Sequence, residues 1–92
     1  MEILRVATSS NPKSVAGAVI AILEQSEELA LLAVGAGAVN QTVKAIAIAR
    51  SYMKTRNIGI YADISFDRAV IDGIEKTAMK FVIVSEKLEI ID

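Results

Sequence analysis

Two polar clusters in this 92-residue sequence contain residue types that bind anions, and each lies at the start of a predicted helix. The first cluster combines hydroxyl groups, an amide and a cation: Ser10, Asn11, Lys13 and Ser14. The second joins a glycine turn to polar side chains: Gly35, Gly37, Asn40, Gln41 and Lys44. The first N–H groups of a helix lack intrahelical acceptors, and the helix dipole favours negative charge there. Both clusters are therefore candidate phosphate-binding sites.

Each cluster also has a purely structural interpretation. Residues 35–40, GAGAVN, partly match the dinucleotide fingerprint, but the chain is too short for a dinucleotide-binding fold. A glycine turn that only permits close backbone packing explains Gly35 and Gly37 equally well. Residues 10–14 are likewise typical of an ordinary helix cap. The sequence leaves the structural and the anion-binding interpretations open at both places.

The residue types that are absent restrict catalysis. The chain has no histidine and no cysteine, which excludes imidazole acid–base chemistry, thiol nucleophiles and Cys/His zinc sites. The acidic residues Asp63, Asp67, Asp72 and Glu75 do not have the spacing of a calcium loop. We therefore expect no enzymatic activity, no metal and no cofactor.

Hydrophobic periodicity predicts the elements that position these residues. Strands are expected at residues 2–7, 29–35, 58–66 and 77–85, and helices at residues 12–25 and 38–54. Residues 67–76 are expected to form a projecting loop that contains an Asp72-Gly73 turn. Residues 86–92 are a charged tail or a short extra strand. The order predicts one α/β domain over residues 1–92, a two-layer βαβαββ sandwich with a mixed four-stranded sheet and two helices.

This topology brings the two clusters together. Consecutive parallel strands place the following helix N-termini at one edge of the sheet, so Lys13, Lys44 and Asn40 are expected to converge. Charge is also uneven along the chain. Residues 1–62 contain six basic and four acidic residues, whereas residues 63–92 contain four basic and seven acidic residues. The N-terminal two thirds of the chain thus favour an anionic ligand more than the rest does.

Apolar residues lie on two sides of the predicted second helix. We assign Val39, Val43, Ile46 and Met53 to the core side. The opposite side contains Ala45, Ile48 and Tyr52, and such an apolar side predicts a homodimer or higher homo-oligomer with these residues at the interface.

Two further features have consequences for packing. Gly17, within the first helix, is expected to allow close backbone approach. In the third strand the alternating residues are expected to face inward: Ile58, Ile60, Ala62, Ile64 and Phe66.

Neither a membrane span nor a signal peptide is expected. The longest uncharged run, residues 29–43, has fifteen residues, contains glycines and ends in polar side chains, so it is too short to cross a bilayer. The N-terminus lacks the basic region and cleavage pattern of a secretory signal. We expect a cytoplasmic protein.

Three segments resemble the stage V sporulation protein S family: residues 10–18, residues 35–50, and residues 71–73 with Thr77-Ala78. The resemblance extends to about Ser85 and implies a role in sporulation. It also implies a fold like that of the archaeal chromatin protein Alba, a dimer that binds DNA and RNA. Alba-like proteins carry arginines and a lysine around the glycine turn, where this chain has Gly35, Gly37 and Gln41. Lys13 is retained, so the resemblance implies weak nucleic-acid binding.

We therefore expect a non-catalytic developmental regulator that binds DNA or RNA as a dimer, through phosphate contacts at both helix N-termini. One alternative is a protein–protein interaction module that uses the second helix and the hairpin. Another alternative is a small nucleotide or anion sensor.

Overall fold

The computed structural model describes residues 1–25 and 28–88. Its elements are β1 (Glu2–Val6), α1 (Pro12–Glu24), β2 (Leu29–Ala33), α2 (Ala36–Lys54), β3 (Ile58–Ile71) and β4 (Ile74–Lys87). The strands form one sheet in the order β1-β2-β4-β3, in which only the β1–β2 pair is parallel. The predicted βαβαββ order and mixed sheet are confirmed. Of the tail at residues 86–92, positions 86 and 87 belong to β4, and residues 89–92 lie outside the described part.

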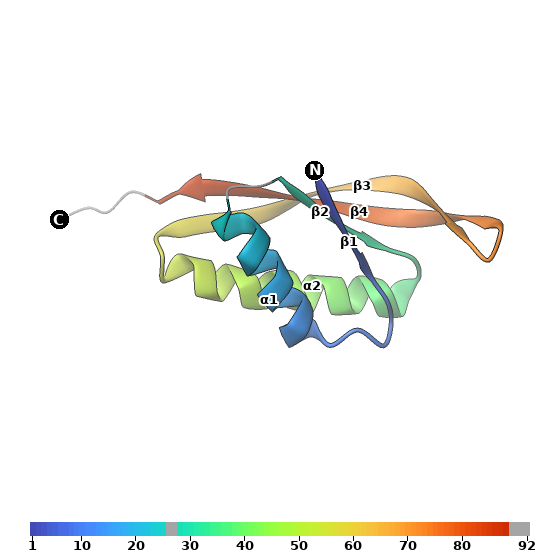
Figure 1. Cartoon of the computed structure of the whole chain (residues 1–92), viewed down its shortest axis with the longest axis horizontal. Coiled ribbons are helices and arrows are strands. Elements are labelled where there is room, and N and C mark those ends of the chain that lie inside the picture. Colours follow the sequence, from blue (N-terminus) through green and yellow to red (C-terminus); the bar gives the residue numbers. More distant parts are fainter. Residues whose placement is uncertain (26–27, 89–92) are drawn as a thin grey trace.

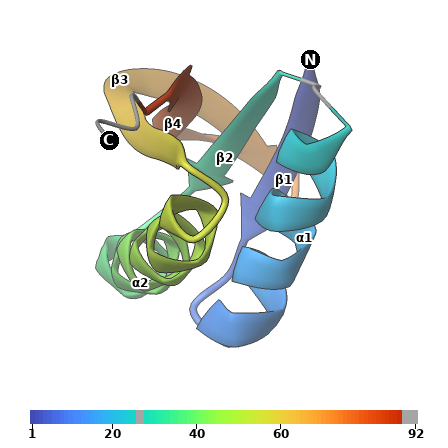
Figure 2. The ribbon, with the colours of Figure 1, turned by 90° about the vertical axis from the view of Figure 1, so that its left-hand side faces the viewer.

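The domain has two layers. Figures 1 and 2 show both helices on one face of the sheet, with α1 beside β1 and α2 on the side of β3 and β4. Between the layers, β2 and β4 contribute Leu29, Leu31 and Phe81 to the core, and the helices contribute Val19 and Met53. No helix in the described ranges is long and apolar enough to cross a membrane.

The helix α1 agrees with the prediction except at Gly17. Asn11 is its N-cap and Pro12 its first residue, a position where the missing proline N–H has no cost. Gly17 is exposed, and a Cβ built on it would meet no atom within 4 Å. The expected close backbone approach at Gly17 is therefore wrong, because this residue lies on the solvent side of α1.

The buried side of α2 differs from the predicted one. The residues that face the core are small or slender: Ala38, Thr42, Ala45, Ala49 and Met53. Val43, which we assigned to the core, is 52% exposed, and Val39 and Ile46 are only partly buried. Alanines allow the helix to lie close to the sheet, which a row of valines would prevent. Ala45 is fully buried inside its own chain, so its assignment to a subunit interface is wrong.

The β3–β4 hairpin is longer than predicted. The two strands pair continuously from Ile58–Lys87 to Ile71–Ile74. Asp72 and Gly73 form the turn with φ of 51° and 76°, as a two-residue hairpin turn of type I′ requires. The predicted turn is confirmed, but the predicted loop at residues 67–76 is wrong, since most of it is strand.

The hairpin extends beyond the helices, as Figure 1 shows, in a molecule of 54 × 21 × 19 Å. α2 rises about 28 Å over its length, a distance that a strand covers in about eight residues. The hairpin therefore leaves the helix layer near Phe66. This explains why Ile60 is buried while Phe66 is 78% exposed; Ile64, two residues earlier on the edge strand β3, is already 54% exposed. The prediction that Ile64 and Phe66 face an interior is wrong.

Candidate nucleic-acid interface

The N-terminus of α1 has no free backbone donor. The Asn11 side-chain oxygen accepts hydrogen bonds from the N–H groups of Lys13 (2.9 Å) and Ser14 (3.3 Å). Pro12 has no N–H, and the Val15 N–H donates to the Asn11 carbonyl at 3.0 Å. Asn11 thus satisfies the groups that we expected a phosphate to bind. The structural interpretation accounts for Asn11, whereas the Lys13 side chain remains available as a phosphate ligand at this helix end.

The two serines of the first cluster have separate positions. The Ser10 hydroxyl accepts a hydrogen bond from the Ala7 N–H at 2.9 Å, which closes the turn that follows β1. Ser14 and Ser10 line a shallow hollow with Arg5, between α1 and β1. This hollow does not include Lys13. The residues of the first cluster therefore do not form a single site.

The N-terminus of α2 is open by comparison. Gly35 is the N-cap with φ of 90° and ψ of 158°, and no side chain caps the helix. The Val39 N–H donates to the Gly35 carbonyl at 3.0 Å. Among residues 1–25 and 28–88, no loop carbonyl and no side chain accepts a hydrogen bond from the N–H groups of residues 36–38. This helix end retains donors and a positive dipole end for an anion.

The polar residues of α2 lie later in the helix than predicted. Because α2 begins at Ala36, Asn40 and Gln41 belong to its second turn. Asn40 is exposed, whereas the Gln41 amide donates to the Thr8 carbonyl at 3.2 Å. Gln41 thus connects the loop after β1 to α2. This contact uses one N–H of the Gln41 amide, and its role as a phosphate ligand stays a prediction.

Thr8 is a residue of this region that sequence reasoning missed. A Cβ built on Gly37 would lie 2.7 Å from Thr8 Cγ2 and 2.8 Å from Thr8 Oγ1. The glycine is therefore required for close approach, as one of its two interpretations predicted. The signal was present in the topology, because Thr8 follows a strand that is parallel to the strand before Gly35.

Lys13 and Lys44 line the same surface hollow. The hollow has a volume of about 520 Å³, and its other lining residues are Asn11, Pro12, Ala47 and Ile48. The two lysines thus line one hollow, as expected, but Asn40 does not line it. The lining of the hollow combines two cations with an apolar surface. Ile48, which we assigned to a subunit interface, lies in this hollow.

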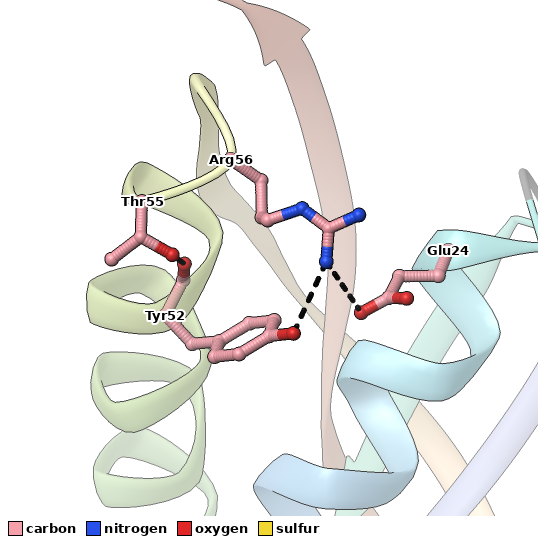
Figure 3. A network of polar contacts seen from close by, with 4 residues as sticks. All are labelled: Glu24, Tyr52, Thr55 and Arg56. Carbon is pink, nitrogen blue, oxygen red and sulfur yellow. Dashed lines mark hydrogen bonds and ion pairs between the residues drawn. The ribbon is translucent and has the colours of Figure 1, made fainter.

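Tyr52 contributes to a polar contact between the ends of the two helices (Figure 3). Its hydroxyl accepts a hydrogen bond from the Arg56 guanidinium at 3.2 Å, and the same nitrogen lies 3.9 Å from Glu24 Oε1. Both charged side chains are well exposed, so this ion pair contributes little to stability. Tyr52 and Ile48 nevertheless lie on the side of α2 that faces α1.

Charge is divided between the layers. The helix layer, defined here as residues 8–25 and 36–57, has five cations and one carboxylate. The cations are Lys13, Lys44, Arg50, Lys54 and Arg56. The hairpin, residues 58–87, has four cations and five carboxylates. A polyanion is thus attracted to the helix layer. The described residues contain no group of three or more acidic side chains that could hold a metal ion.

The comparison with known proteins gives one family. The sequence model described as Stage V sporulation protein S matches residues 2–86 of this chain. The match spans all six elements except the last residue of β4. It therefore includes both helix N-termini, the hollow between Lys13 and Lys44, and the hairpin.

Proposed function

Because the chain belongs to the stage V sporulation protein S family, we propose that it acts in sporulation as a non-catalytic regulator that binds nucleic acid. One observation carries the proposal: Lys13 and Lys44, from different helices, line one hollow in a layer with a large excess of cations. Lysines and free backbone N–H groups are the donors that bind nucleic-acid phosphates. The bound group is a phosphate of the backbone, and the base sequence is not read.

The proposed nucleic-acid interface is small, and its size determines the affinity and the salt dependence of binding. Each neutralised phosphate adds slightly less than one to the salt slope of binding. With Lys13, Lys44 and the open α2 N-terminus in each protomer, we expect a slope of about one to three per subunit. Affinity is consequently weak and falls as salt is raised.

The test is a binding titration with single- and double-stranded DNA and RNA at two salt concentrations. Lys13→Glu and Lys44→Glu should each weaken binding by roughly three- to tenfold at low salt, equally for all sequences. Lys87→Glu is the matched control, because this exposed lysine at the end of β4 makes the same charge change far from the hollow. Equal losses from all three variants would show diffuse attraction instead of a site.

A second candidate function is a protein-interaction module without nucleic acid. It is favoured by the hairpin, which exposes Phe66, Val70 and Ile74 at 78%, 63% and 61% and has no excess of cations. Large exposed apolar patches mark contacts with proteins. An absence of any nucleic-acid binding by the wild type at low salt would select this function.

The functional unit in either case is proposed to be a homodimer. The exposed apolar residues of α2 and β3 are the reason, since a monomer of this size rarely leaves so many in contact with water.

A further inference from the structure

The strand β1 forms one edge of the sheet, and its outer backbone groups are unpaired over two residues. Figure 2 shows β1 at the margin of the sheet, with β2 on one side and no described strand on the other. The Glu2 N–H donates to the Glu28 carbonyl at 2.9 Å, at the start of the β1–β2 ladder. Because backbone groups alternate in direction along a strand, Ile3 and Arg5 direct their N–H and C=O groups outward. Within residues 1–25 and 28–88, no loop group or side chain bonds to them.

This open edge ends at Ala7, because Ser10 occupies the outward groups of that residue. The Ser10 hydroxyl accepts a hydrogen bond from the Ala7 N–H at 2.9 Å, and the Ser10 N–H donates to the Ala7 carbonyl at 3.0 Å. Ser10 thus bonds to Ala7 as a residue of a neighbouring strand would. The edge that stays open accommodates a strand of about four residues, opposite positions 2–5.

A hollow between β1 and α1 lies beside the open edge. Its volume is about 270 Å³, and its apolar lining comes from Leu4, Val15 and Ala18. Leu4 lies between the two outward residues of β1 and packs against the core, so its side chain is on the helix side of the sheet. A residue of an added strand that stands opposite Leu4 therefore directs its own side chain toward this hollow. The lining suits an aliphatic side chain there.

The charges along β1 define the other side chains of an added strand. By alternation with Leu4, Ile3 and Arg5 lie on the sheet face opposite the helices, and both are exposed. Arg5 makes no ion pair among the described residues. At the start of β1 the charge is opposite, since Glu2 and Glu28 are exposed carboxylates. A complementary strand therefore has a carboxylate opposite Arg5, an aliphatic residue opposite Ile3 and a cation opposite Glu2.

We propose that β1 is a docking site for an extended peptide segment of another protein, which adds to the sheet as a fifth strand. The segment runs antiparallel to β1, because antiparallel pairing is slightly more stable per residue. Its sequence is an acidic residue, two aliphatic residues and a basic residue, opposite positions 5, 4, 3 and 2. This site involves neither the Lys13–Lys44 hollow nor the hairpin, so the inference goes beyond the proposed function.

A second copy of β1 does not meet these requirements. Two β1 strands that pair through their open edges bring residues of the same sheet face opposite one another. The carboxylate of β1 belongs to Glu2, which lies on the helix side, so no register places it opposite Arg5 of the other copy. The occupant is therefore a segment with a different sequence.

The test uses a synthetic peptide, acetyl-Ser-Glu-Val-Val-Lys-Ser-amide, in which the serines only add solubility. The site is short, so binding is weak, and the peptide is titrated to millimolar concentration into ¹⁵N-labelled protein. In NMR spectra the amide signals of Ile3 and Arg5 should shift, and both N–H groups should gain protection from hydrogen exchange. The Leu4 N–H already bonds to β2, so its protection should change less.

Two N-methylated peptides separate backbone pairing from side-chain attraction. In the proposed register the residues opposite Ile3 and Arg5 exchange hydrogen bonds with β1, whereas the residue opposite Leu4 directs its N–H away from β1. N-methylation of the second valine, opposite Ile3, should weaken binding by about fivefold, as expected for one lost hydrogen bond. N-methylation of the first valine, opposite Leu4, should leave the affinity nearly unchanged.

A charge reversal in the protein tests the register. Arg5→Glu should weaken binding of the peptide by about three- to tenfold. A peptide with lysine in place of its glutamate should then bind this variant better than it binds the wild type. Lys76→Glu is the matched control, because it makes the same charge change at an exposed position in the hairpin. Circular dichroism of both variants should match the wild type, since both side chains are exposed.

Several results would overturn the proposal. These are unchanged Ile3 and Arg5 amide signals at millimolar peptide, equal losses from the two N-methylated peptides, or equal losses from Arg5→Glu and Lys76→Glu. Shifts of the same amides with protein concentration alone would assign the edge to a second copy instead. Shifts produced only by single-stranded DNA would assign it to nucleic acid. The effect of Lys13→Glu on nucleic-acid binding is measured separately, so the proposed function does not depend on these results.

Discussion

At the scale of single residues, two glycines should respond in opposite ways to substitution by alanine. Gly35 has φ of 90° and ψ of 158° at the start of α2, a region that only glycine occupies without strain. Gly17 lies inside α1 with open space around it. We predict that Gly35→Ala lowers the free energy of unfolding by about 1–3 kcal/mol. Gly17→Ala should raise it by about 0.5–1 kcal/mol, because alanine is the better helix former.

Urea denaturation measures the free energy of unfolding of both variants, which carry the same glycine-to-alanine substitution. If Gly35→Ala were as stable as the wild type, the backbone at the start of α2 would differ from the one described. Nucleic-acid binding by the Gly35→Ala variant is a second measurement, because this turn holds the open N–H groups at the start of α2 in place.

At the scale of elements, α2 owes its position to the small residues on its buried side. Ala49 is fully buried against the sheet, whereas Ala47 is exposed on the same helix. Ala49→Leu should destabilise the protein by about 1–3 kcal/mol, since the extra methylene groups force the layers apart. Ala47→Leu should change stability by less than about 0.5 kcal/mol. Thermal and urea unfolding measure both, and equal effects would contradict the assignment of the buried side.

At the scale of the whole molecule, the proposed homodimer predicts that stability depends on protein concentration. Anything that binds only the folded state raises the apparent stability by mass action, and a second copy is such a ligand. The midpoint of thermal unfolding should therefore rise by about 3–6 °C for each tenfold increase in protein concentration. Ile64→Glu, which places a charge among the exposed apolar residues of β3, should give a midpoint that does not change with concentration. A constant midpoint in the wild type would indicate that monomers unfold independently.

The sequence by itself determined the order of the elements and the turn chemistry, although the hairpin strands are longer than predicted. Local signals were sufficient for these features: the Asn11-Pro12 cap begins α1, alternation marks β3, and Asp72-Gly73 forms the hairpin turn. Parallel β1 and β2 also follow from the βαβ order, and they bring Lys13 and Lys44 to one hollow. Such features depend on neighbouring residues or on connectivity, which the sequence contains directly.

Only the tertiary structure decided which groups are free and which surfaces are covered. Asn11 occupies the donors of α1, Gln41 holds Thr8, and Ala45 faces the core while Val43 does not. α2 has apolar residues on several sides, so periodicity alone does not select the one that packs on the sheet. Close packing selects it, because only the alanine side allows the layers to approach. Phe66 is exposed for a related reason: its strand extends beyond the end of α2, a length relation that no single segment contains.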